Sequence, residues 1–166
     1  MSSTGRHQLM ELLNNLRIET RVVEHPAVFT VDAMMDYLKD VDGFVTKNLF
    51  LKDKKNKLWL LCTSHSSQIK LSDVAKLVGA AGTLRFADEK IMIEKIGVAQ
   101  GCCTPLSLIN DKNNDVKLIL DQNLLRDGSW IYSHPLENTA TLGMSVENFK
   151  MFLKETGHEP KVINVN

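Results

Sequence analysis

The chain has 166 residues, 43% of them apolar, which suits one globular domain spanning residues 1–166 with a substantial hydrophobic core. Its 20 lysines and arginines balance its 20 aspartates and glutamates, so the zero net charge excludes a general electrostatic attraction to nucleic acid or anionic membranes and leaves only local basic patches. The chain has no long apolar run, no signal-peptide pattern and only three cysteines, without C-x-x-C spacing, so we expect a soluble cytoplasmic protein with no disulfide framework, zinc site, membrane partner or DNA partner.

Five segments combine a capping residue with apolar residues at helical spacing, and each predicts an amphipathic helix packed against the core. The first is an N-terminal helix within residues 1–19. The second is expected to carry Lys39 in its last turn and to end before Gly43. The predicted helices begin at Thr4, Thr30, Ser72, Asp88 and Ser145.

Runs rich in apolar and β-branched residues, bounded by turn residues, predict the strands. Two pairs of these runs flank polar turns and predict β-hairpins, 44–51 with 58–63 and 106–109 with 116–120. Helices outside a set of hairpins predict an α+β fold, in which a mixed, largely antiparallel sheet curls into an open, barrel-like shape around a pocket. The predicted strands cover residues 21–24, 44–51, 58–63, 84–87, 106–109, 116–120, 130–133, 141–144 and 162–165.

The segment 97–105, with the sequence Gly-Val-Ala-Gln-Gly-Cys-Cys-Thr-Pro, joins the fourth predicted helix to the strand predicted over 106–109. Two glycines four residues apart, with small residues around them, allow the backbone to approach a ligand closely. Equally, Gly97 could only cap the helix while Pro105 opens a strand. The segment matches neither G-x-G-x-x-G nor G-x-x-x-x-G-K-[ST], which excludes a nucleotide-hydrolysing loop.

Other residues are candidates for a functional site, but their pattern does not define a reaction. Lys47 and Asn48 lie inside a predicted strand, where a lysine is unusual unless it faces solvent at a sheet edge or a pocket. Cys102 or Cys103, with His134 as a base, has the ingredients of a thiol hydrolase, although buried cysteines are usually inert small apolar residues. The five histidines are scattered without ligand spacing, so we expect no metal.

Three blocks in fixed order resemble a known family. They are Lys47-Asn48 within a strand, the glycine turn 97–105, and His134-Pro135-Leu136-Glu137-Asn138 followed by Thr139 and Thr141. Together they are similar to the prolyl-tRNA synthetase-associated editing domains, which are aminoacyl-tRNA deacylases related to the editing insertion of bacterial prolyl-tRNA synthetase. The closest likeness is to free-standing members that clear alanine from proline tRNA. The resemblance runs from roughly Thr20 to the C-terminus.

The resemblance implies a mixed α/β fold with a curled sheet, and trans-acting hydrolysis of the ester that joins a mischarged amino acid to the 3′-terminal adenosine. The implied substrate is alanyl-tRNA(Pro), and the implied partners are the tRNA acceptor end and prolyl-tRNA synthetase. It implies no metal, cofactor or protein nucleophile, because backbone groups and the ribose hydroxyl of the substrate position the water. Such an ester is already activated, so positioning and donors for the developing oxyanion are a sufficient form of catalysis.

The resemblance also implies roles for individual residues in the three blocks. Lys47, beside Asn48, corresponds to the strand lysine that holds the terminal nucleotide through its phosphate. Positions in the glycine turn face the ester, and the third block forms the opposite wall. The implied catalytic residues are Lys47, Gly101 and His134, and the implied substrate-binding residues are Asn48, Thr104, Pro105 and Asn138.

Two other hypotheses stay open. Cys102 and Cys103 stand where the family commonly has small residues or glycine, which leaves a Cys-dependent esterase or thioesterase as an alternative. A non-catalytic module that binds tRNA or a synthetase is the second alternative, because no residue is an obligatory nucleophile. A cluster of lysines either contacts the acceptor stem or is merely solvated. It comprises Lys52, Lys54, Lys55, Lys57, Lys70 and Lys76.

Overall fold

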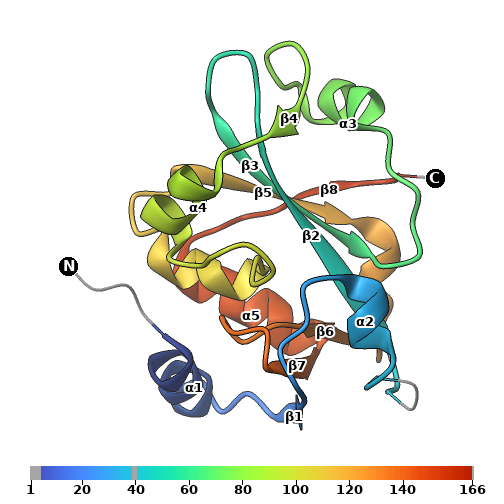
Figure 1. Ribbon diagram of the computed structural model, residues 1–166, viewed down its shortest axis with the longest axis vertical. Coiled ribbons are helices and arrows are strands. Elements are labelled where there is room, and N and C mark those ends of the chain that lie inside the picture. Colours follow the sequence, from blue (N-terminus) through green and yellow to red (C-terminus); the bar gives the residue numbers. More distant parts are fainter. Residues whose placement is uncertain (1–4, 39–40, 166) are drawn as a thin grey trace.

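The computed structural model describes residues 5–38 and 41–165, and Figure 1 shows helices on both sides of a strongly twisted sheet. The described helices are α1 (Arg6–Asn15), α2 (Val31–Met35), α3 (Leu71–Val78), α4 (Glu89–Ile96) and α5 (Val146–Thr156), with 3-10 helices η1 (Pro105–Asn110) and η2 (Gln122–Leu124). The strands are β1 (Thr20–Glu24), β2 (Phe44–Lys52), β3 (Leu58–Ser64), β4 (Arg85–Phe86), β5 (Val116–Asp121), β6 (Trp130–Ser133), β7 (Ala140–Ser145) and β8 (Lys161–Ile163).

The strands form a sheet in the order β1-β7-β6-β2-β3-β5-β8, with β4 attached to β2. The pairs β1/β7, β6/β7, β2/β3 and β2/β4 are antiparallel, whereas β2/β6, β3/β5 and β5/β8 are parallel. The two ends of this order, β1 and β8, are not paired with each other, so the sheet does not close. The prediction of a mixed, largely antiparallel, open sheet surrounded by helices is confirmed.

Strand β3, near the centre of the sheet, is buried on both faces, which explains its nearly continuous apolar sequence. On one face, Leu60 and Cys62 of β3 pack in a large core with residues of α1, α4 and α5. On the other face, Trp59 and Leu61 pack against α3. All seven residues of β3 are buried. Side chains that alternate along β2 therefore enter two different packed layers.

Strand β2 has an edge that is only partly paired. One edge pairs with β3 throughout Thr46–Lys52, whereas the other pairs with β6 only at Phe44 and Val45 and with β4 only at Leu51 and Lys52. Over residues 46–50, no described strand pairs with this second edge. The carbonyl of Phe50 faces it and accepts a hydrogen bond from the Ala87 N–H at 3.0 Å. Since backbone groups in an antiparallel pair alternate in direction, those of Asn48 point into the same gap.

The strand predicted over residues 106–109, and the second hairpin built on it, are wrong. The segment forms η1, in which Pro105 occupies the first position and the Thr104 hydroxyl accepts a hydrogen bond from the Leu106 N–H at 3.2 Å. Proline and a threonine cap favour a helical turn here, and a short apolar run alone cannot distinguish strand from buried helix. Strand β5 instead pairs in parallel with β3 and β8.

The helix boundaries differ from the predictions at several ends. The predicted start at Thr4 lies outside the described residues, and Gly5 is the N-cap of α1. Helix α2 ends at Met35, so the prediction that it carries Lys39 in its last turn is wrong, and Lys39 itself lies outside the described residues. Helix α3 begins at Leu71 with Lys70 as its N-cap, one residue before the predicted start at Ser72. Thr30 and Ser145 cap α2 and α5 with their hydroxyl oxygens, as predicted. Asp88 is the N-cap of α4 by position but makes no side-chain capping bond.

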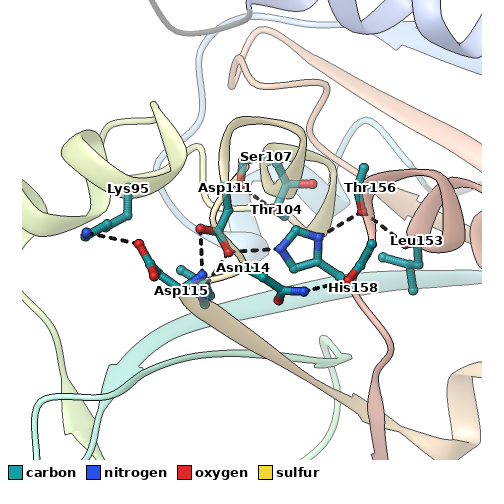
Figure 2. A network of polar contacts seen from close by, with 11 residues as sticks. Lys95, Thr104, Ser107, Asp111, Asn114, Asp115, Leu153, Thr156 and His158 are labelled. Atoms are coloured by element: carbon teal, nitrogen blue, oxygen red, sulfur yellow. Dashed lines mark hydrogen bonds and ion pairs between the residues drawn. The ribbon is translucent and has the colours of Figure 1, made fainter.

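A buried polar network fixes the region around the end of η1 (Figure 2). Asp111 accepts hydrogen bonds from the Val116 N–H at 2.8 Å and the Asp115 N–H at 3.0 Å, and its Oδ2 lies 2.9 Å from His158 Nε2. The other ring nitrogen of His158 lies 3.0 Å from the Thr156 hydroxyl. His158 is only 2% exposed. The network joins η1, the start of β5 and the segment between α5 and β8.

Candidate functional site

A cavity of about 280 Å³ lies along the unpaired edge of β2. Four of the seven residues that the resemblance implies for the site line it, although they come from three distant blocks of the chain: Lys47, Asn48, Gly101 and His134. The remaining lining residues are Phe29, Thr30, Met34, Thr46, Leu49, Cys103 and Ser133. The fold therefore brings the three blocks to one place.

Lys47 enters this site from β2, where it pairs with Thr63. Its register puts its side chain on the same face of the strand as Leu49 and Leu51, opposite to Asn48. The Lys47 ammonium donates a hydrogen bond to the backbone carbonyl of Ser67. An ammonium has three donors, so this bond still leaves donors for an anionic ligand.

Asn48 carries the polar atom that lacks a partner. Its Nδ2 donates to the Thr46 hydroxyl at 3.2 Å, and that hydroxyl donates to the Tyr132 carbonyl at 2.9 Å. Among the described residues, Asn48 Oδ1 is the one buried side-chain oxygen or nitrogen without a hydrogen-bond partner. A buried acceptor left unpaired costs about 1–3 kcal/mol, which calls for a specific explanation such as a ligand donor.

The glycine turn supplies the facing wall. Gly97 ends α4 in the left-handed conformation, with φ of 71°, as the capping alternative predicted. Gly101 also has a positive φ, 87°, and a Cβ there would lie 3.1 Å from Cδ1 of the Phe29 ring. The Gln100 N–H donates to Glu89 Oε2 at 2.6 Å, which ties the turn back to the first turn of α4. One glycine thus caps the helix and the other lines the cavity, whereas Pro105 opens η1 and not the expected strand.

His134 lies half-buried after β6. Its Nδ1 is 2.8 Å from the Ala140 carbonyl, so Nδ1 carries the hydrogen and Nε2 is left as an acceptor in the neutral ring. Burial lowers the pKa of His134 below its ordinary value of 6.5, and nearby His25 adds to this, whereas the Ala140 carbonyl opposes it. The ring of His25 lies 6.1 Å from that of His134 between centroids. At neutral pH the site therefore presents an uncharged imidazole.

Three predicted residues do not line the cavity. Thr104 and Pro105 are buried and begin η1, so they hold the end of the glycine turn. The Asn138 side chain donates from Nδ2 to the Val28 backbone carbonyl at 2.7 Å, and the backbone carbonyl of Asn138 accepts from the Val28 N–H at 3.1 Å. These paired bonds fasten the segment before α2, which carries Phe29, to the β6–β7 connection. All three residues brace walls of the cavity.

The sequence pattern missed the residues that close the cavity on the α2 side. Phe29, Thr30 and Met34 belong to this group, and Phe29 is 74% exposed despite its size. An exposed phenylalanine before a helix cap carries no signal on its own, since scattered apolar residues are common on surfaces. Ser133 could have been inferred, because it is adjacent to His134.

The cysteines have little thiolate character. Cys103 lines the cavity, and burial raises the pKa of its thiol to about 12. Burial also raises the pKa of the Cys102 thiol, an effect that the Asn138 backbone opposes. Because the thiolate is the nucleophile, neither cysteine has the environment of an activated one.

The part of the chain that the structure describes was also compared with the requirements of a metal site and of a membrane-spanning helix. Within residues 5–38 and 41–165, no three His, Cys, Asp or Glu side chains are grouped in a way that could hold a metal ion. None of the helices in these ranges has the length and apolar character needed to cross a bilayer. The polar groups lining the cavity are thus backbone amides, hydroxyls, an amide, an ammonium, a neutral imidazole and the Cys103 thiol.

Comparison with known proteins gives a consistent result. Residues 25–152 match the model of the aminoacyl-tRNA editing domain. The chain is 49% identical over 162 residues to prolyl-tRNA synthetase associated domain-containing protein 1 of Mus musculus, covering 96% of this chain and 95% of the relative. It is 28% identical over 167 residues to the prolyl-tRNA editing protein ProX of Acetoanaerobium sticklandii, covering 99% and 100%.

Solved structures share the fold. The hypothetical protein APE2540 superimposes with a TM-score of 0.72 at 19% identity, over 95% of this chain and 98% of that one. A candidate trans-editing enzyme for prolyl tRNA synthetase superimposes with a TM-score of 0.69 at 21% identity, over 99% of each chain. The matching domain spans all three sequence blocks that meet at the cavity, and the chain belongs to the aminoacyl-tRNA editing domain family.

Proposed function

We propose that the protein is a trans-acting deacylase that hydrolyses mischarged aminoacyl-tRNA, with alanyl-tRNA(Pro) as its substrate. The observation that carries the proposal is the meeting of Lys47, Asn48, Gly101 and His134 at one cavity, within a domain of the editing family. The names of the relatives support prolyl-tRNA synthetase as the source of the mischarged tRNA and as a partner.

In the proposed reaction, water attacks the carbonyl carbon of the aminoacyl ester. The bond from that carbon to the ribose 3′ oxygen then breaks, the 3′ oxygen takes a proton, and the free amino acid leaves. The backbone N–H groups of Gly101 and Asn48 are suited to receive the oxyanion, because Gly101 lines the cavity and Asn48 lies on the unpaired edge of β2 beside it. The small residues of the turn permit this close approach.

His134 and Lys47 have separate proposed tasks. The neutral His134 ring offers Nε2 as an acceptor for a hydrogen of the ribose hydroxyl or of the attacking water, while Ala140 fixes the tautomer. The Lys47 ammonium is proposed to contact the phosphate of the terminal nucleotide, exchanging or supplementing its bond to the Ser67 carbonyl. Asn48 Oδ1 would accept a further donor from the substrate.

The proposed preference for alanine rests on size. Phe29 and Met34 close the α2 side of the cavity, and a wall of bulky apolar side chains there would exclude a proline ring while it leaves room for a methyl group. An apolar pocket discriminates poorly against smaller side chains, at about 1–3 kcal/mol per methylene. We therefore expect strong rejection of proline and weaker rejection of glycine.

The experiment is a deacylation panel in which tRNA(Pro) carries alanine, serine, cysteine or proline. We expect release of alanine to exceed the spontaneous rate by at least about 100-fold and release of proline to stay near it. Binding of alanyl-tRNA(Pro) without turnover under excess substrate would contradict the deacylase proposal and favour a tRNA-binding module.

The same panel separates the proposal from thiol chemistry. A Cys102→Ser/Cys103→Ser double variant is expected to keep most of the alanine-releasing activity, because the raised pKa of the Cys103 thiol leaves almost no thiolate at neutral pH. Loss of activity in this variant, while it remains folded by circular dichroism, would favour the Cys-dependent esterase.

A further inference from the structure

A second hollow, of about 340 Å³, adjoins the cavity that holds Lys47 and His134. The two spaces share a wall made of Asn48, Leu49, Gly101 and Cys103. The second hollow is also lined by Phe50, Phe86, Ala87, Glu89, Met92 and Gln100. These six residues have no task in the reaction proposed above, so the hollow is available for another part of the same ligand.

The hollow suits a flat, uncharged group. Phe50 and Met92 form a buried apolar floor, and no lysine, arginine or histidine lines it. Its one carboxylate, Glu89, already accepts the Gln100 N–H. At the rim, Phe86 is 63% exposed on the two-residue strand β4. An exposed aromatic ring beside an apolar hollow is a typical stacking surface for a nucleobase.

We propose that this hollow binds the adenine base of the 3′-terminal nucleotide, which stacks on Phe86; the inference rests on the proposed function of the neighbouring cavity. The ribose of that nucleotide carries the ester at its 3′ position and the base at its 1′ position. If the ester occupies the cavity beside His134, the ribose lies at the shared wall and the base needs space on the other side. The second hollow is that space.

Polar groups at the wall and rim fit this placement. Asn48 Oδ1, buried and unpaired, belongs to the shared wall, where a ribose hydroxyl would meet it. Gln100 is exposed at the rim of the hollow, and a carboxamide offers the donor and acceptor that match the N7 and N6 edge of adenine. No cationic side chain lines the hollow, so it is not suited to bind a phosphate.

The test compares two non-hydrolysable ligands, 3′-alanylamino-3′-deoxyadenosine and the same compound without its base, by isothermal titration calorimetry. Base stacking on an aromatic ring is commonly worth a factor of about ten or more in affinity. We therefore expect wild-type protein to bind the adenosine compound at least about tenfold more tightly than the baseless one. Phe86→Leu should remove most of this preference, whereas Phe86→Trp should keep it.

Ile93→Ala is the matched control, because Ile93 is 49% exposed on the adjacent helix α4 but does not line the hollow. It should leave the preference unchanged. Equal binding of the two ligands by wild type, binding of neither, or an undiminished preference in Phe86→Leu would overturn the proposal. Deacylation of alanyl-tRNA(Pro) by the same preparations separates the two claims. Absence of wild-type hydrolysis contradicts the deacylase, whereas hydrolysis unaffected by Phe86→Leu contradicts only the base site.

Discussion

Two histidines show how differently this protein treats its polar groups. His158 is buried with both ring nitrogens engaged, one with Asp111 and the other with Thr156 (Figure 2). His134 is half-buried and has only Nδ1 engaged, with the Ala140 carbonyl, while no described residue pairs with Nε2. A fully satisfied polar network stabilises and fixes a fold, whereas an unsatisfied acceptor beside a cavity is available to a ligand.

The same contrast applies to the acceptors next to these histidines. Asp111 receives three donors, but Asn48 Oδ1 at the cavity receives none. A site that keeps unsatisfied groups for its substrate gives up some stability. Substitutions in the Asp111 network should therefore change stability, and substitutions at the cavity should change activity.

The largest effect is expected for Asp111→Ala. Burial alone would raise the pKa of Asp111, but the bonds from His158, Val116 and Asp115 outweigh it and hold the pKa below its ordinary value. Removing the carboxylate leaves these buried partners unpaired, so we expect a loss of about 3–5 kcal/mol in the free energy of unfolding, measured by urea denaturation. Activity per folded molecule should stay near that of wild type.

Asp115→Ala is the control for this substitution. Asp115 lies on the same turn but is exposed, and its ion pair with Lys95 at 3.2 Å is at the surface. Such pairs contribute only about 0–1 kcal/mol. A loss below about 1 kcal/mol in Asp111→Ala, similar to that of the control, would remove the basis for treating the network as the stabilising region.

The next effect is expected for Asn48→Leu, which should lower activity while it changes stability little. Leucine removes the unpaired buried oxygen and loses one hydrogen bond to Thr46, so the free energy of unfolding should change by no more than about 1 kcal/mol. Hydrolysis of alanyl-tRNA(Pro) should fall at least about tenfold in kcat/KM. Strong destabilisation with unchanged kcat/KM would show that Asn48 is a structural residue.

The smallest effect is the change with pH in the contribution of His134 to the free energy of unfolding. Because burial lowers the pKa of His134 in the folded protein below 6.5, the unfolded chain binds this proton first as the pH falls. Stability from His134 is therefore complete above pH 6.5, decreases below it, and levels off below the folded pKa. The difference in unfolding free energy between wild type and His134→Gln, measured from pH 8 to about pH 5, should show this slope.

The dependence of kcat/KM on pH should also follow the ionisation of His134. If neutral His134 is required, the acid limb of kcat/KM should lie below pH 6.5, with His25 and Lys47 as the other titratable groups near the ring. An acid limb above pH 6.5, or one that persists in His134→Gln, would assign the titration to another group.

Much of the site could be predicted from the sequence because its residues come in recognisable local blocks. A lysine and asparagine inside a β-rich run, and two glycines in a turn after a helix, are chemical anomalies that local pattern reveals. The strands β2 and β3 and the caps Thr30 and Ser145 also follow from local signals. Local sequence patterns therefore predict several elements of the fold and several residues of the cavity.

What could not be predicted depends on distant contacts. The segment 106–109 has the composition of a strand, but Thr104 and Pro105 start a 3-10 helix that buries Leu106 and Leu108 in the main core. The lining by Phe29 and Met34 depends on Asn138 fastening the segment before α2, a bond across 110 residues. The free edge of β2 arises only from the order of the strands in the sheet.

The most direct measurement of the central claim is the initial rate of alanine release from alanyl-tRNA(Pro), at equal concentrations of folded wild type, Lys47→Ala and His134→Ala. The cavity that joins these residues predicts rapid release by wild type and a loss of at least about tenfold in each variant, with unfolding free energies within about 1 kcal/mol of wild type. Wild-type release at the spontaneous rate, or equal rates for all three proteins, would contradict the proposal that this cavity hydrolyses alanyl-tRNA(Pro).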